Sequence, residues 1–381
     1  MSWKIPLFKI CWDEDDINYV TNVISSGMNW AVGAYVEKFE GMISEYLGVK
    51  RCVAFNSGTS ALHATLLAHE IGPGDEVIVP SFTFIATANA PLFAGAKPVF
   101  ADIEEETFGL DPDDVSNKIS PRTKAIIPIH YGGCPCRIKE LKDMADDRKL
   151  VLIEDAAEAF GASVGDQKVG TFGSSAILSF CQNKIITTGE GGAVVMNSEE
   201  ICERLKLIRS HGRDDSHADY FLSPDSGRYV ALGYNFRLSN ILAALGVSQL
   251  RKVDRIIRDR QRKAALYYSK LKNLNNKVIL PGSPAGYRHV YQIYTIRVDA
   301  NIRNELQSGL AEKGIMTKVY FSPVHLTEFY RANFGHREGE LPVTERLARE
   351  VLSLPLYVSL TEQEISYIAE STGETIEEIG V

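Results

Sequence analysis

Apolar positions between residues 50 and 197 fall into short runs separated by stretches with helical spacing. The runs are Cys52–Phe55, Glu76–Val79, Pro98–Ile103, Lys124–His130, Leu150–Asp155, Ala176–Phe180 and Ala193–Met196. Several of them are continuously apolar, which is typical of strands that are buried on both faces of a sheet. The alternation of strands and helices predicts a largely parallel sheet covered by helices, and therefore an α/β fold.

The pattern changes in the second half of the chain. Ser239 begins a helical pattern that continues to about Leu271, and we expect one long helix that bridges two domains. Beyond Pro281 the pattern predicts a strand over 289–298, a helix over 303–313 and a strand over 316–321. We therefore predict a large domain, residues 1–250, followed by a connecting helix and a small α+β domain, residues 251–381.

Composition excludes several classes of protein. The chain has 41 basic and 49 acidic residues, and this net charge of −8 disfavours an extended nucleic-acid surface. No apolar run reaches the ~18 residues of a membrane span, and the first residues lack the apolar core of a secretion signal. We expect a cytoplasmic protein without membrane association.

The six cysteines show no paired CxxC spacing, so we expect buried thiols rather than disulfides. Cys134 and Cys136 form the one close pair and follow His130 in a predicted loop. Because no second pair of ligands accompanies them, we predict no metal site.

Lys184 lies between the predicted strand Ala176–Phe180 and the glycine-rich turn 189–192. A lysine that forms a Schiff base is often displayed in this way. A solvated loop lysine beside a hairpin turn fits this stretch equally well. Other segments must decide between the two interpretations.

Asp155 ends the predicted strand Leu150–Asp155. In open parallel sheets, ligands bind beyond the carboxyl ends of the strands, so this carboxylate is placed to face a site. A pyridoxal phosphate enzyme needs such a group to keep the pyridine nitrogen protonated. The alternative role of an aspartate in this position is a helix cap.

A third segment predicts an anion site. The strand Cys52–Phe55 leads through the turn Asn56, Ser57 and Gly58 into a helix over 59–69. The start of a helix presents free backbone N–H groups and a positive dipole end to an anion. We expect the N–H groups of Gly58 and Thr59 to be the donors, although an ordinary strand-to-helix connection would have the same pattern.

Five motifs follow one another through nearly the whole chain. They are NSGTSALHA from residue 56, PSFTFIATANA from 80, IEDAAEAFGA from 153, SFCQNKIITTGEGG from 179 and GYNFRLSNILAALG from 233. In this order they resemble the DegT-type (DegT/StrS) nucleotide-sugar aminotransferases, which have the aspartate aminotransferase fold (fold type I) and use pyridoxal phosphate. The TTGEGG turn is most similar to that of perosamine synthase-like members, which aminate carbon 4 of a keto sugar. Members that aminate carbon 3 more often have a GDGG-like turn, so Glu190 favours carbon 4.

The resemblance implies a role for each matched residue around the cofactor ring. Lys184 would bind the cofactor as a Schiff base and move the proton in catalysis. Because a free lysine ionises near pH ~10.4, its pKa must be lowered for this work. Asp155 would pair with the ring nitrogen, Glu158 would lie beside the phenolic oxygen, and Phe84 would stack on the ring. Phe84 could instead belong to the core.

The resemblance also implies the phosphate contacts and an oligomer. Ser179 would donate its hydroxyl to the cofactor phosphate alongside Ser57, Gly58 and Thr59. Asn235 would reach the phosphate of the neighbouring subunit, which implies a homodimer with shared active sites. A dimer of dimers is equally compatible.

Three residues are candidates for the sugar site: Trp30, Arg213 and His325. A surface position without function is the alternative for each of them. The chain departs from many relatives at Phe160, where they have histidine, and at Cys181, where they have an aromatic residue or histidine. Both departures put substrate contacts carried over from the family in doubt.

The resulting hypothesis is transfer of an amino group from glutamate to a nucleotide-linked keto-deoxysugar. The best guess is conversion of GDP-4-keto-6-deoxymannose to GDP-perosamine, an amino sugar for a surface polysaccharide such as the O-antigen of lipopolysaccharide. Two half reactions should give ping-pong kinetics. The alternatives are a 3-aminotransferase acting on a dTDP-linked 3-keto sugar, and an inert cofactor-binding regulator.

Two further enzyme classes are disfavoured. Sugar dehydratases of the same fold have histidine in place of the lysine, and this chain retains Lys184. A nicotinamide-dependent dehydrogenase would need GxGxxG after a strand, and no such motif follows a predicted strand.

Overall fold

The computed structural model describes residues 3–214, 228–274 and 276–380. Its centre is a seven-stranded sheet with the order β1-β9-β8-β5-β4-β2-β3. These strands are β1 (Arg51–Phe55), β2 (Glu76–Pro80), β3 (Lys97–Ala101), β4 (Thr123–Ile126), β5 (Val151–Asp155), β8 (Ser175–Ser179) and β9 (Gly192–Met196). β9 runs antiparallel to both of its neighbours, and the other pairings are parallel. The predicted, largely parallel sheet is confirmed.

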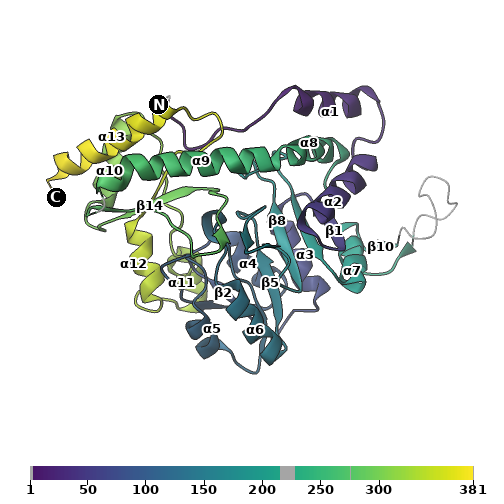
Figure 1. Cartoon of the computed structure of the whole chain (residues 1–381). Helices are drawn as coiled ribbons and strands as arrows, with labels where there is room; N and C mark the ends of the chain where they lie inside the picture. The colour runs from purple at the N-terminus through teal and green to yellow at the C-terminus, as the bar shows by residue number, and fades with distance from the viewer. Residues whose placement is uncertain (1–2, 215–227, 275, 381) are drawn as a thin grey trace.

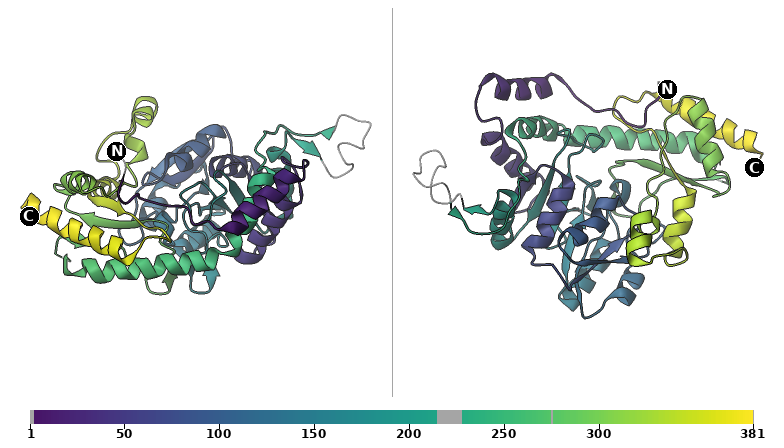
Figure 2. Two further views of the ribbon diagram at one scale, coloured as in Figure 1. Left: turned by 90° about the horizontal axis from the view of Figure 1, so that it is seen from above. Right: turned by 180° about the vertical axis from the view of Figure 1, so that it is seen from behind.

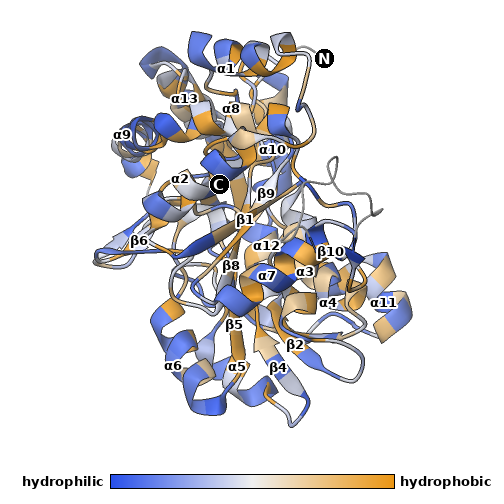
Figure 3. Cartoon of the chain, turned by 90° about the vertical axis from the view of Figure 1, so that its right-hand side faces the viewer, coloured by the Kyte–Doolittle hydropathy of each residue, from blue (hydrophilic) through white to orange (hydrophobic). Residues whose placement is uncertain are grey.

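Helices cover this sheet on both faces (Figure 1). They are α2 (Ala34–Leu47), α3 (Gly58–Ala68), α4 (Ile85–Phe93), α5 (Pro112–Lys118), α6 (Ile138–Arg148) and α7 (Glu199–Arg209). The helix α1 (Glu14–Ser25) lies outside these layers and packs against the helix Asn240–Arg251. The central strands are apolar, whereas the outer helix α6 is largely polar (Figure 3). The sheet is therefore buried between helices whose polar faces meet solvent.

The predicted long helix after Ser239 is in fact two helices, α8 (Asn240–Arg251) and α9 (Val253–Leu271). Ser239 caps α8 by accepting a hydrogen bond from the Leu242 N–H. Lys252 separates the helices with a non-helical backbone, and its Nζ lies 2.6 Å from Asp13 and 2.7 Å from Asp16. The break thus falls where the chain is tied to α1, close to the predicted domain boundary, which remains a prediction.

A smaller α+β region follows α9, which crosses the top of the molecule in Figure 1. Its sheet has the order β12-β14-β15. The elements are β12 (Val278–Ile279), β14 (Tyr294–Val298), β15 (Val351–Leu354), α10 (Arg303–Glu312), α11 (Glu328–Phe334), α12 (Pro342–Glu350) and α13 (Glu362–Ile379). The helix α13 packs against α9 and α10, and the first described residues lie at the same end of the molecule (Figure 2).

Short elements complete the described chain. A small sheet has the order β13-β6-β7, and β10 pairs with β11. The bounds are β6 (Ser163–Val164), β7 (Gln167–Lys168), β10 (Arg213–Asp214), β11 (Arg228–Tyr229) and β13 (Tyr287–Arg288), with the 3-10 helices η1 (Tyr131–Gly133), η2 (Lys272–Leu274) and η3 (Val324–Leu326).

Two predicted strands are wrong in whole or in part. Only β14 forms within the strand predicted over 289–298, because Tyr291 has a positive φ of 51° that interrupts extended backbone. The strand predicted over 316–321 is reduced to a single bridge between Lys318 and Ser353. One residue of each stretch contacts the site described below: Gln292 binds the Asn183 carbonyl, and the ring of Phe321 lies beside that of Phe84.

None of the helices in the described ranges combines the length and the apolar character that crossing a membrane requires.

Candidate active site

The candidate residues gather where β1, β5 and β8 end. Asp155 is the last residue of β5 and Ser179 the last of β8, while Ser57 follows β1 after one intervening residue. These strands share one direction, so their carboxyl ends meet at one edge of the sheet. The loop that carries Lys184 begins just beyond Ser179.

Lys184 is paired with Glu158. The lysine Nζ lies 3.2 Å from Glu158 Oε1, and the side chains are 15% and 8% exposed. The other carboxylate oxygen of Glu158 accepts a hydrogen bond of 2.9 Å from the Gly132 N–H. The backbone therefore fixes one carboxylate oxygen of Glu158, and the other oxygen binds the amine of Lys184.

Asp155 is buried and only partly satisfied. Its Oδ2 accepts a 2.7 Å hydrogen bond from the Thr87 hydroxyl, and its Oδ1 a 3.2 Å bond from the Ala157 N–H. Burial raises the pKa of Asp155, while these hydrogen bonds and the positive charge of Lys184 act in the opposite direction. A cation placed against this carboxylate would remove the cost of its buried charge.

The turn before α3 is open to an anion. Ser57 caps the helix and accepts a 3.1 Å hydrogen bond from the Ser60 N–H. Among the described residues, no acceptor meets the N–H groups of Gly58 and Thr59. A Cβ atom on Gly58 would lie 3.1 Å from the Cβ of Ser179, so the absence of a side chain lets β8 and this turn come together.

Phe84 is 61% exposed, which excludes the alternative that it belongs to the core. It is the N-cap residue of α4, and its ring centroid lies 6.5 Å from that of Phe321. Thr87, one turn further along α4, donates to Asp155. The helix therefore carries both the exposed ring and a hydroxyl that orients the buried carboxylate.

Asn235, Trp30 and Arg213 lie apart from the Lys184–Glu158 pair. The Asn235 side chain is exposed, and its carbonyl accepts a 3.3 Å hydrogen bond from Asn56. Trp30 is 49% exposed on the segment before α2, and Arg213 lies in β10. Within the described part of the chain, no hydrogen bond or ion pair joins Asn235 or Trp30 to Lys184.

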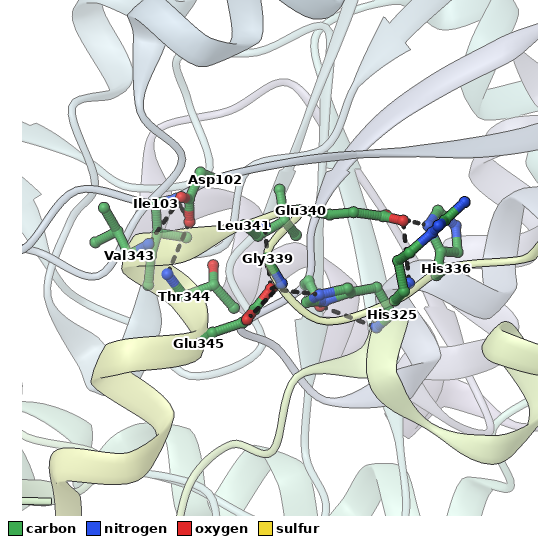
Figure 4. Close-up of polar contacts among 12 residues, drawn as sticks. Asp102, Ile103, His325, His336, Gly339, Glu340, Leu341, Val343, Thr344 and Glu345 are labelled. Atoms are coloured by element: carbon green, nitrogen blue, oxygen red, sulfur yellow. Dashed lines mark hydrogen bonds and ion pairs between the residues drawn. The ribbon is translucent and has the colours of Figure 1, made fainter.

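The placement of His325 at the sugar site does not fit its surroundings. His325 is buried, its Nδ1 lies 2.7 Å from the Ser81 hydroxyl, and its Nε2 lies 3.3 Å from Glu345 Oε1 (Figure 4). Both ring nitrogens are thus used inside the protein, and burial lowers the pKa of the ring. His325 ties the segment before α11 to the end of β2 and is not available to a substrate.

Asp102 makes a parallel tie between the two parts of the molecule (Figure 4). It follows β3 and accepts hydrogen bonds from the N–H groups of Val343 and Thr344, at 2.9 and 2.8 Å. The carboxylate therefore caps α12, whose N-terminus is the positive end of its dipole. The C-terminal segment is held over the large sheet at both Ser81 and Asp102.

Several residues that support the site were not predicted from the sequence. Thr87 lies within the second motif, three residues after Phe84, and its position on the same helical face was the available signal. Gly132, whose N–H fixes Glu158, has a positive φ of 61° and gave no pattern. His130, near the two cysteines, accepts a hydrogen bond from the Cys136 N–H at its Nδ1 and donates one from its Nε2 to Glu154, so it is part of a buried network.

The two departures from the family pattern occupy different environments. Phe160 is buried and stacks on Tyr46 with 5.2 Å between ring centroids. Cys181 is half-buried, and its Sγ lies 3.7 Å from Glu190 Oε1. Cys181 lies in the loop that carries Lys184, and Phe160 contacts the base of that loop through the ring of Phe180, with 6.3 Å between centroids.

The arrangement fits pyridoxal phosphate. Lys184 is a nearly buried amine, Asp155 is a buried carboxylate with a raised pKa, and the free N–H groups of Gly58 and Thr59 form a seat for a phosphate. A Cβ atom on Gly192 would lie 2.5 Å from the Ser57 carbonyl carbon, so the glycine-rich turn also packs against this seat. These groups match in chemistry the three requirements of the cofactor: an amine for a covalent anchor, a carboxylate for the ring nitrogen and an anion site for the phosphate.

Residues 10–372 match the model of the DegT/DnrJ/EryC1/StrS aminotransferase family. The chain is 36% identical over 367 residues to the GDP-perosamine synthase of Caulobacter vibrioides, covering 96% of each chain. It is also 38% identical over 362 residues to a pleiotropic regulatory protein of Geobacillus stearothermophilus, covering 94% of each.

The solved structures include NtdA from Bacillus subtilis with bound cofactor PMP. It superposes with a TM-score of 0.86 at 30% identity, covering 96% of this chain and 82% of the NtdA chain. The fold type I assignment and the use of pyridoxal phosphate are both confirmed by these comparisons.

Proposed function

Because the chain belongs to the DegT/DnrJ/EryC1/StrS aminotransferase family, we propose that it transfers an amino group from glutamate to a nucleotide-linked keto-deoxysugar. The proposed acceptor is GDP-4-keto-6-deoxymannose and the product GDP-perosamine, formed in the cytoplasm. The observation that carries the chemistry is the Lys184 amine, 3.2 Å from Glu158 at the edge of the sheet where Asp155 ends β5. The sugar is supported by the perosamine synthase relative and by Glu190 in the TTGEGG turn.

The protein residues divide the proposed work between them. Bound pyridoxal phosphate supplies the electron sink that makes loss of a proton from the amino-group carbon possible. Lys184 carries that proton, and Glu158 orients the lysine amine by accepting its hydrogen bond. Asp155, held by Thr87, provides the buried negative charge that keeps a ring nitrogen protonated.

We propose Ser57, Gly58, Thr59 and Ser179 as the phosphate seat and Phe84 as the stacking ring. Asn235 is exposed, as a residue that serves a neighbouring subunit must be, and we propose that two copies share their active sites. Trp30 and Arg213 remain candidates for the sugar side. His325 is not retained.

Product analysis tests the sugar directly. The purified protein would be given glutamate, pyridoxal phosphate and, in separate reactions, the GDP-linked 4-keto-6-deoxysugar, the dTDP-linked 4-keto-6-deoxysugar or a dTDP-linked 3-keto sugar, and the amino sugar would be identified by NMR. We expect a 4-amino product from the GDP sugar. Conversion of the dTDP-linked 3-keto sugar alone would contradict the proposal in favour of a 3-aminotransferase.

A further inference from the structure

The loop that carries Lys184 is held differently at its base and at its tip. At the base, the Thr188 N–H and the Thr187 hydroxyl both donate to the Phe180 carbonyl, at 3.0 Å. Behind the tip lies a hollow between loop residues 182–185 and the side chains of Cys11, Gln249 and Arg260. Ile185 is buried in the hydrophobic core, so packing holds this end of the tip, while hydrogen bonds hold the residues that border the hollow.

Gln292 provides such a bond. Its side chain is buried, and its Nε2 donates to the Asn183 carbonyl at 2.5 Å. Asn183 is the residue directly before Lys184. The Oε1 of Gln292 is buried without a hydrogen-bond partner among the described residues. Because an unpartnered buried acceptor is unfavourable, the useful part of this side chain is its donor.

The backbone of Gln292 is fixed by Arg260 of α9. The buried guanidinium donates to the Tyr291 carbonyl at 2.7 Å and to the Gln292 carbonyl at 2.6 Å. Burial lowers the pKa of Arg260 to about 10, so the group remains charged at neutral pH. The donor of Gln292 therefore extends from a rigid position.

The same segment also supports Glu158. The Ile293 N–H donates to the Gly132 carbonyl at 3.3 Å, and the Gly132 N–H donates to Glu158 at 2.9 Å. Residues 291–293 are thus connected to both members of the Lys184–Glu158 pair. One route passes through Asn183 and the other through Gly132.

We propose that Gln292 is a positioning residue for the aminotransferase reaction. Its side-chain N–H holds the tip of the loop, and thereby places the Lys184 amine against Glu158 for each proton transfer. Gln292 acts through the Asn183 carbonyl and makes no contact with Lys184 itself. The inference rests on Lys184 being the reacting lysine and is independent of which sugar is aminated.

The test compares Gln292→Met with Gln261→Met. Methionine has a similar length, removes the donor and also removes the unpartnered oxygen. Gln261 is the matched control, because its Nε2 donates to a backbone carbonyl of the same segment, that of His289 at 2.8 Å, away from the loop. If Gln292→Met does not fold, Gln292→Leu removes the same donor without adding a buried charge.

The first measurement is amide hydrogen exchange of peptides covering 181–188 in the cofactor-free protein. We expect exchange up to about tenfold faster in Gln292→Met, the equivalent of one hydrogen bond, and no change in Gln261→Met. The second is the single-turnover rate with glutamate, which we expect to fall by a similar factor with little change in the glutamate concentration for half-maximal rate.

Unchanged exchange and turnover in Gln292→Met, or equal changes in the Gln261→Met control, would overturn the inference. Failure of the proposed sugar assignment would leave both measurements intact, because neither uses the sugar.

Discussion

Glu154 and Asp155 are neighbours at the end of β5, and both are buried, yet the protein treats their carboxylates differently. Successive side chains of a strand point to opposite faces of the sheet. Glu154 meets four donors: the N–H groups of Gly170, Phe172 and Gly173 at 2.7–2.8 Å, and His130 Nε2 at 3.1 Å. Asp155 meets two, from Thr87 and Ala157, and lies on the side of Lys184.

The comparison shows how one strand end serves both structure and chemistry. A carboxylate has about four acceptor positions, so the donors around Glu154 leave it no capacity for a ligand. They fold the segment from Gly170 to Gly173 back onto β5. Asp155 keeps acceptor positions that no donor among the described residues fills. Burial raises its pKa, and a cationic partner would lower the pKa again by stabilising the ionised carboxylate.

Asp155→Asn should have the largest effect on activity. An amide cannot hold a ring nitrogen protonated, so we expect kcat for amino transfer from glutamate to fall by about 10²- to 10⁴-fold. The cofactor-free variant should be at least as stable as the wild type, because a buried charge is removed. Steady-state kinetics measures the fall in kcat, and thermal unfolding of the cofactor-free protein measures the stability. A large loss of stability would show that the role of Asp155 is structural.

Glu154→Gln should give the opposite result. In the variant, the amide nitrogen would face N–H groups that donate to a carboxylate oxygen in the wild type. We therefore expect a loss of about 3 kcal/mol in the free energy of unfolding. Urea unfolding of the cofactor-free protein measures it. The folded fraction should retain the wild-type rate with glutamate to within a few fold. A decrease in this rate as large as that of Asp155→Asn would contradict the different roles of the two carboxylates.

Thr87→Val sharpens the comparison by removing one of the two donors to Asp155. The isosteric change should cost about 1 kcal/mol of stability and lower kcat by about tenfold, because the carboxylate loses both orientation and a stabilising hydrogen bond. Ser163→Ala is a suitable control, since that hydroxyl donates to the Gly165 carbonyl at 2.9 Å, away from Lys184. Equal effects of the two substitutions would rule out a specific role for Thr87.

The pH dependence of stability should show the smallest effect. The pKa of Asp155 is raised in the folded state, so its ionisation opposes folding. This cost begins to decrease as the pH falls through the folded-state pKa and is gone below the usual carboxyl pKa. The stability advantage of Asp155→Asn over the cofactor-free wild type should therefore shrink as the pH is lowered from 7 towards 4. Thermal midpoints in that range measure it, and a gap that widens on acidification has the wrong sign.

The sequence was informative where local pattern and chemistry agree. Continuous apolar runs predicted the strands of the large sheet, and the turn before α3 could be recognised as the start of a helix. By contrast, Glu154 and Asp155 cannot be told apart by pattern, because their donors come from distant segments. The place of Asp155 at the end of a predicted strand made it a candidate, and the resemblance added its role beside the ring nitrogen.

The errors also have physical causes in distant contacts. His325 looked like a site residue, but its partners Ser81 and Glu345 are 244 and 20 positions away and can be found only in the fold. The segment over 289–298 alternates like a strand, yet Arg260 binds the carbonyls of Tyr291 and Gln292 that a strand would offer to a neighbour. The role of Gln292 could not be predicted from the sequence either, because its partners Asn183 and Arg260 are 109 and 32 positions away.

The most direct test of the account is the visible absorption spectrum of the protein with pyridoxal phosphate, recorded for the wild type, Lys184→Ala and Asp155→Asn before and after glutamate. We expect a yellow Schiff-base band in the wild type that disappears with glutamate, no such band in Lys184→Ala, and a band in Asp155→Asn that glutamate changes only slowly. A glutamate-sensitive band that survives in Lys184→Ala would contradict the assignment of the reacting lysine and, with it, the site proposed here.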